Sequence, residues 1–277
     1  MDRRLFLGLV ATGLAGLATR PLSAVRLSRV GLQLRSVAGA LGPDLTAALQ
    51  RVASIGYRDI EFWTPPGLSF DPVQIRRAMD QVSLSAPSRH VPMADVFSNW
   101  RVVLNTCRIL GNRHVVCEEV PAAQRTTLAG YGKVAELLNA AGKISQWAGM
   151  QLVVHQHVSD FQPINGVIPF EYLASHTDPG LVKFQMNLAA TNRAGRDPLA
   201  DLARFSGRFV SLHLSDAGGP PVRSPAGLGE GVINLPAILS SASRANLQYF
   251  FVADERPESP WEHAAANFRY ASELEFE

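Results

Sequence analysis

The chain has 277 residues, of which 47% are hydrophobic and 18% charged, and this composition excludes disordered, fibrous and coiled-coil proteins. Its 26 basic and 24 acidic residues give a formal net charge of +2, which offers no case for nucleic acid or an anionic membrane as a partner. A chain of this length can bury a sizeable core as one domain.

Residues 1–24 have the features of a signal peptide. Arg3 and Arg4 precede an apolar run from Leu5 to Ala18, and the segment ends at the small residue Ala24. The run is shorter than the roughly 20 residues that a transmembrane helix needs. The paired arginines resemble a twin-arginine signal, so we expect export to the periplasm or beyond the cell. Cleavage would leave a single domain, residues 25–277, with no stable membrane anchor.

From residue 29 onward, short apolar segments alternate with longer amphipathic segments. The apolar segments predict strands over Val30–Leu34, Asp59–Phe62, Leu84–His90, His114–Glu118, Gln151–His155, Val182–Asn187, Phe209–His213 and Tyr249–Ala253. The amphipathic segments predict helices over 44–54, 72–82, 98–110, 126–148, 168–176, 197–205, 234–245 and 260–274. This alternation predicts an α/β fold, a (β/α)8 TIM barrel, with an open doubly wound sheet as the alternative.

Residues with known terminal preferences fix several helix boundaries. Asp44 and Ser259 are predicted to begin the first and last helices, and Gly56 and Gly111 to follow helix ends. The only two cysteines, Cys107 and Cys117, fall on a predicted helix and the next strand. We expect two buried thiols there, although an oxidising compartment leaves a disulfide open.

Polar side chains gather where the predicted strands end, which is the catalytic end of a barrel. Residues two apart on a strand share a face, so His155 and His157 point the same way if the strand continues. Together with His213 they could bind one divalent metal or share acid–base chemistry, whereas a lone histidine is more often structural. The other candidates at this end are Glu61, Trp63, His90, Gln185, Asn187, Asp216, Glu230 and Glu255. Trp63 is either a sugar platform or a packing aromatic, and Glu61 and Glu230 could equally be rim or loop charges.

Seven different short motifs follow one another along the chain after residue 24. They are Val30–Val37, Ala53–Glu61, Ala148–His157, Thr177–Phe184, Arg193–Pro198, Leu212–Asp216 and Gly229–Ile233. This set resembles the sugar phosphate isomerase/epimerase family, whose fold is the xylose-isomerase-like barrel. The resemblance covers essentially the whole mature chain and implies that barrel fold.

The resemblance also implies a metal site on the late strands. Metal-dependent members hold Mn²⁺ or Mg²⁺ with acidic residues and a histidine, beside two carbons of a ketose or aldose. Here His213 matches that histidine, while Asn187 and Ala253 stand where an aspartate and a glutamate are expected. His155 stands where many epimerases have a glutamate. The implied ligand set His155, Asn187 and His213 has no formal negative charge, so Mg²⁺ should bind weakly. We expect Zn²⁺, Mn²⁺, Fe²⁺ or Ni²⁺, with softer ions favoured, or no metal at all.

Three functions stay open from the sequence. The first is an exported sugar isomerase or epimerase that removes a proton beside a carbonyl, with His155 or His157 as base and Glu61 or Glu255 as acid. In it, the substrate-binding residues would be Trp63, His90, Gln185, Asp216 and Glu230. The second is a non-catalytic carbohydrate-binding or accessory barrel, and the third is a histidine-centred metal-dependent lyase or hydrolase. A small carbohydrate is the expected partner, and a homodimer is possible.

Overall fold

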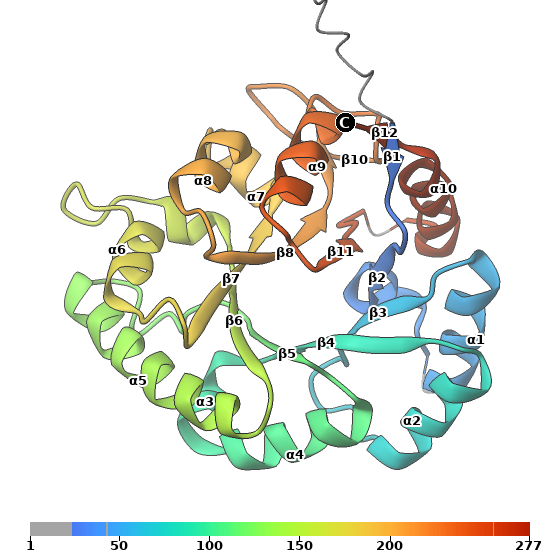
Figure 1. The fold of residues 1–277 in the computed structure, drawn as a ribbon, viewed down its shortest axis with the longest axis horizontal. Helices are drawn as coiled ribbons and strands as arrows, with labels where there is room; N and C mark the ends of the chain where they lie inside the picture. Colours follow the sequence, from blue (N-terminus) through green and yellow to red (C-terminus); the bar gives the residue numbers. More distant parts are fainter. Residues whose placement is uncertain (1–23, 43, 257) are drawn as a thin grey trace, which may run out of the picture.

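Eight parallel strands form a closed barrel in the order β11-β2-β3-β4-β5-β6-β7-β8 (Figure 1). The structure is a computed structural model that describes residues 24–277 except 43 and 257, so the predicted signal segment up to residue 23 lies outside it. The barrel strands are β2 (Gly31–Gln33), β3 (Asp59–Phe62), β4 (Ser85–Val91), β5 (His114–Cys117), β6 (Gln151–His155), β7 (Val182–Asn187), β8 (Phe209–Leu214) and β11 (Tyr249–Val252). All eight predicted strands are confirmed, and the predicted TIM barrel with them.

Helices surround the barrel, as Figure 1 shows. They are α1 (Leu45–Ile55), α2 (Pro72–Gln81), α4 (Trp100–Leu110), α5 (Leu128–Trp147), α6 (Pro169–His176), α8 (Pro198–Arg204), α9 (Leu235–Arg244) and α10 (Pro260–Glu273). Each lies at a predicted helix, with boundaries that differ by one or two residues. Within the described ranges, no helix is both long and apolar enough to cross a membrane.

Local side-chain chemistry explains several of these boundaries. Asp44 accepts hydrogen bonds from the backbone N–H of Thr46 and Ala47, which caps α1 as predicted. Gly56 ends the same helix at φ 125°, and a Cβ at this position would lie 2.4 Å from the ring of Phe268. Ser259 precedes α10 as predicted and Pro260 lies in its first turn, but Ser259 has φ 47° and its side chain makes no capping bond.

Short elements that the sequence analysis did not predict lie mostly where strands lead into loops. They are η1 (Leu34–Ala40), α3 (Met93–Ser98), η2 (Val158–Phe161) and α7 (Leu188–Arg193). Two small antiparallel pairs join β1 (Val25–Arg26) to β12 (Glu275–Phe276) and β9 (Asp216–Ala217) to β10 (Pro225–Ala226). Except for β1 and β12, each of these elements follows the carboxyl end of a barrel strand, so they build the rim of the barrel mouth.

The barrel strands separate two environments by alternation. On β3, Ile60 and Phe62 are fully buried in the large apolar core, whereas Glu61 between them contacts polar groups of other strands. Polar residues inside the barrel are therefore held by their strands at defined positions.

Cys107 and Cys117 are buried free thiols, and burial raises the pKa of Cys107 to about 11.

Candidate metal centre and active site

A cavity of about 800 Å³ opens at the carboxyl end of the barrel. Its lining includes the side chains of His90, His155 and His213, which lie at the last or next-to-last positions of β4, β6 and β8. Its wall comes from the loops that follow the strands and includes Arg35, Trp63, Glu118, His157, Asn187 and Glu255. This is the end where barrel enzymes hold their active sites.

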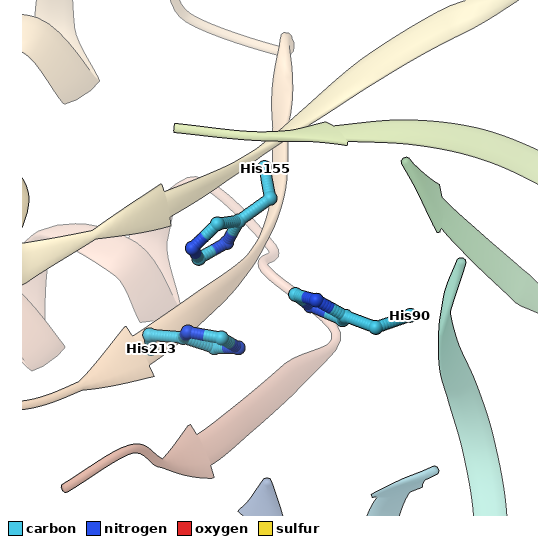
Figure 2. Close-up of side chains that lie close together, drawn as sticks. All are labelled: His90, His155 and His213. Atoms are coloured by element: carbon cyan, nitrogen blue, oxygen red, sulfur yellow. The ribbon is translucent and has the colours of Figure 1, made fainter. Parts of the chain in front are cut away.

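The three histidines converge on one another, as Figure 2 shows. One ring nitrogen from each lies within 4.8 Å of the corresponding nitrogens of the other two. The rings of His155 and His213 have centroids 4.4 Å apart, and those of His90 and His155 are 5.0 Å apart. All three residues are buried, so the cluster is held by the strands. Three imidazoles at such spacing are a ligand set for a divalent transition metal.

Glu61 lies beneath two of these rings and is fully buried. Its Oε2 is 2.9 Å from His90 Nε2 and also contacts Nε2 of His213. Its Oε1 accepts hydrogen bonds from Ser88 Oγ at 2.7 Å and Gln185 Nε2 at 2.8 Å. A carboxylate that holds the ring N–H of a metal-binding histidine fixes the orientation of that ring. Glu61 is thus placed to position the cluster rather than to meet a substrate.

Gln185 fixes the remaining ring. Its Oε1 lies 2.7 Å from His155 Nδ1 and 3.0 Å from His90 Nε2, and its Nε2 also donates to Ser211 Oγ at 3.1 Å. The side chain is fully buried and does not reach the cavity surface. Gln185, predicted to bind substrate, is placed by the structure as a support for His90 and His155.

Burial and neighbouring charges set the protonation of the cluster. Burial would raise the pKa of Glu61, but the adjacent rings of His90 and His213 hold it well below its usual value. Burial would lower the pKa of His90, yet the Glu61 carboxylate outweighs it and raises that pKa. For His155 and His213, burial dominates and lowers the pKa. His155 and His213 are thus neutral imidazoles, the form in which histidine binds a metal.

The metal ligand set predicted from the sequence is only partly reproduced. Asn187 caps α7, with Oδ1 accepting from the backbone N–H of Ala190, and turns its Nδ2 toward His155 Nε2 at 3.2 Å. An amide N–H is not a metal ligand, so this orientation does not add Asn187 to the set. His90, predicted as a substrate-binding residue, takes the third place in the cluster.

Two residues that line the cavity each have a buried polar atom without a partner among the described residues. His157 Nδ1 and Glu118 Oε1 are buried atoms that make no hydrogen bond there. Burial, followed by the charges of His90 and Arg35, lowers the pKa of His157 to about 4, so its ring is neutral at physiological pH. Glu118 Oε1 lies 3.9 Å from His90 Nδ1. Both residues line the cavity, so each brings a titratable side chain to its wall.

Three other predicted site residues serve structural contacts. Glu255 lines the cavity, but both of its oxygens bind Arg193, at 2.6 and 3.0 Å. Asp216 is buried outside the cavity and accepts backbone N–H bonds from the 229–233 segment, so the loop after β8 is tied to its strand. Glu230 is exposed in that loop and pairs with Arg256 at 3.4 Å. Trp63, the predicted sugar platform, does line the cavity.

Sequence reasoning missed the support network and one wall residue. Ser88 and Ser211 point inward because they alternate with residues that pack outward, and only a correct strand register reveals this. The wall residue is Glu118, which the sequence alone does not distinguish from Glu119 beside it. Glu119 instead pairs with Arg125 and accepts from Ser159 Oγ at 2.8 Å. Arg35 carried no signal, because its loop was not predicted to form the 3-10 helix η1.

Comparisons with known proteins agree on the fold. No family model matches the chain. A sugar phosphate isomerase/epimerase from Parabacteroides distasonis superposes with a TM-score of 0.76 at 21% identity, covering 89% of this chain and 96% of that one. A crystal structure described as IolI protein with a bound zinc atom superposes with a TM-score of 0.70 at 14% identity, covering 87% and 95%.

Curated relatives match over a shorter length. An inosose dehydratase of Geobacillus kaustophilus is 24% identical over 190 residues, which cover 61% of this chain and 60% of that protein. The chain thus spans about three fifths of the length of this relative. These likenesses and the closed eight-stranded barrel lead to one conclusion: the chain has the xylose-isomerase-like (β/α)8 barrel fold of the sugar phosphate isomerase/epimerase proteins.

Proposed function

We propose that the protein is a metal-dependent enzyme that acts on a carbohydrate or related polyhydroxylated carbonyl compound. The observation that carries this proposal is the convergence of His90, His155 and His213 in the lining of the cavity, with their ring nitrogens within 4.8 Å of one another. Each of these rings has a buried partner, Glu61 or Gln185, which holds its orientation for a ligand. The position of the cluster at the carboxyl end of the barrel makes a catalytic use the natural one.

The donor set fits a borderline divalent ion. Three imidazole nitrogens suit Zn²⁺, Fe²⁺ or Ni²⁺ better than Mg²⁺, which prefers carboxylate oxygens. His155 and His213 are neutral, and His90 would release its proton on binding. When bound, such an ion would polarise a substrate carbonyl. A zinc atom is named in the description of the structurally similar IolI protein, which supports the choice of Zn²⁺ as the first ion to test.

The unpartnered groups of the cavity wall supply the acid–base chemistry in this proposal. Glu118 or His157 would take the proton from the carbon beside the carbonyl. Return of that proton to the carbonyl carbon gives an isomer, provided that the hydroxyl proton of the first carbon passes to the former carbonyl oxygen. Return of the proton to the opposite face of the same carbon gives an epimer. If a hydroxyl on the next carbon leaves instead, a proton from the wall group completes a molecule of water. The names of the similar proteins, isomerase/epimerase and inosose dehydratase, support this range of reactions.

Metal content is the decisive measurement. Elemental mass spectrometry of the untagged full chain should find one transition metal per chain, and His213→Ala should lose it. His176→Ala provides the matched control, because His176 is an exposed histidine on α6, outside the cavity. A protein that stays metal-free after incubation with Zn²⁺, Fe²⁺, Ni²⁺ and Mn²⁺ would contradict the proposal. That result would favour a non-catalytic carbohydrate-binding barrel, for which Asn187 and Ala253 at the expected acidic positions are the supporting observation.

Export is a separate proposal, because the residues that suggest it are not described by the structure. Residues 1–24 fused to a folded reporter should direct it out of the cytoplasm, and replacement of Arg3 and Arg4 by lysine should stop this. Reporter that stays in the cytoplasm with the native leader would refute export.

A further inference from the structure

The cavity wall has three arginines, and they differ in their partners. Arg193 binds both oxygens of Glu255, and Arg256 binds Asp254 at 2.6 Å. Arg35 has no carboxylate within ion-pair distance among the residues that the structure describes. Its side chain is exposed and lines the cavity, so its charge is available to a ligand there.

Arg35 is held next to a flat aromatic surface. Its guanidinium carbon lies 5.9 Å from the centre of the Trp63 ring, which also lines the cavity. A cation near an indole face gains electrostatic attraction, which limits the orientations of the guanidinium. The open part of an indole ring in a cavity offers a stacking surface for the C–H face of a sugar ring. The pair therefore places a fork of N–H donors next to an aromatic ring on the cavity wall.

We propose that Arg35 and Trp63 form a carboxylate subsite, so that the substrate is a sugar acid rather than a neutral sugar. This inference rests on the proposed function and deepens it. A guanidinium pairs with a carboxylate through two parallel hydrogen bonds, and one such fork matches one carboxylate. A phosphate monoester has a higher charge and more oxygens, and none of the three lysines, Lys133, Lys143 and Lys183, lines the cavity. The carboxylate is thus the better match to a single free guanidinium.

The charge pattern across the cavity agrees with an asymmetric ligand. Glu118, on the wall after β5, keeps an unpartnered oxygen, while Arg35 follows β2 on a different part of the wall. A ligand with a carboxylate at one end and hydroxyl groups at the other would place its negative charge on Arg35. Its hydroxyl groups would donate to Glu118. The reverse orientation would bring two carboxylates together and is disfavoured by their repulsion.

The test compares sugars that differ only at one carbon. Isothermal titration calorimetry of the metal-loaded full chain should be run with galacturonate, glucuronate and mannuronate, and with galactose, glucose and mannose. At least one acid should bind about tenfold or more tighter than its neutral counterpart, since a charge-assisted hydrogen-bond pair supports such a ratio. Arg35→Gln should abolish this preference while neutral-sugar binding persists, and Arg35→Lys should restore part of it.

Arg113→Gln is the matched control, because Arg113 lines a different cavity at the opposite end of the barrel. It should leave the preference unchanged. Equal binding of acids and neutral sugars, or a preference that survives Arg35→Gln, would overturn the subsite and leave the proposed function standing. Failure of all six sugars to bind would count against both. Galactose 6-phosphate that binds tighter than galacturonate, and loses this advantage in Arg35→Gln, would replace the carboxylate by a phosphate.

Discussion

Two carboxylates of strand β3, Asp59 and Glu61, lie two residues apart and serve opposite ends of the barrel. Asp59 lines a second cavity of about 480 Å³ at the amino end, where both of its oxygens bind Arg29, at 2.6 and 2.7 Å. Glu61 faces the carboxyl end, where its partners are His90 and His213. The same strand thus pairs one acid with a permanent cation and the other with groups that can lose a proton.

The two carboxylates differ in whether their pairing depends on pH and metal. The Arg29–Asp59 pair is complete as it stands, because the guanidinium always keeps its charge. His90, beside Glu61, can exchange a proton for a metal ion, so its pairing with the carboxylate is conditional. A conservative change at the carboxyl end should therefore lower both the folding free energy and the metal affinity, whereas one at the amino end should lower the folding free energy alone.

Glu61→Gln should have the largest effect. The change keeps the size of the side chain but removes a buried charge from His90 and His213, which we expect to cost about 3–5 kcal/mol of folding free energy. Loss of the group that orients two rings should also weaken metal binding by roughly 10–100-fold. Thermal unfolding and metal titration measure the two effects. Unchanged metal affinity in a folded variant would refute the positioning role of Glu61.

Asp160→Asn should change how stability depends on pH. Burial raises the pKa of Asp160 to about 6 from an unfolded value of 3.8, so the folded state holds its proton more tightly. The stabilisation of the folded state by this bound proton is complete below pH 3.8 and is lost as the pH rises through 6. The free energy of unfolding should fall by about 3 kcal/mol over this range. The variant should not show this loss. Urea unfolding at pH 4 and pH 7 tests it, with the exposed Glu262→Gln as control.

His114→Gln should show the opposite slope. Burial lowers the pKa of His114 to about 4 from 6.5, so the folded state disfavours the proton. The wild-type protein should therefore lose about 3 kcal/mol as the pH falls from 6.5 through 4, and the variant should be spared this part of acid unfolding. The exposed His176→Gln is the matched control. Equal acid sensitivity of the variant and the wild type would contradict the assignment.

Asp59→Asn should have the smallest effect. Arg29 is 53% exposed, so water screens the pair, and the expected loss is about 1 kcal/mol. The metal affinity and the sugar-acid preference should stay at wild-type values, because Asp59 lines only the cavity at the other end. A drop in metal affinity as large as that of Glu61→Gln would show that the two ends are not independent.

The fold could be predicted from this sequence because its local signals agree. Apolar runs, caps such as Asp44 and helix-ending glycines such as Gly56 all give the same strand and helix boundaries. The rim elements η1, α3, η2 and α7 were missed, since each is too short to show a periodic pattern.

The site could be predicted only where a local pattern places the residue. His155 and His213 are predictable because both stand at the carboxyl ends of predicted strands, which meet at one end of a parallel barrel. His90, not Asn187, is the third member of the cluster. Asn187 is left out because its side-chain oxygen accepts a hydrogen bond from the backbone N–H of Ala190 in α7 and so cannot turn toward a metal. The buried role of Gln185 depends on contacts with strands that are distant in sequence, so no local pattern could indicate it.

The pairing of β1 with β12 brings the two ends of the described chain together. Val25 faces Phe276, Arg26 binds Glu275 at 2.7 Å, and β1 and β12 lie side by side outside the barrel (Figure 1). A short peptide linking these ends would permit circular permutation, with new termini cut in another loop. A surface or a carrier attached through the C-terminus would likewise leave the mouth of the cavity turned toward solution. The molecule is thus suited to immobilisation on a sensor chip without obstruction of its cavity.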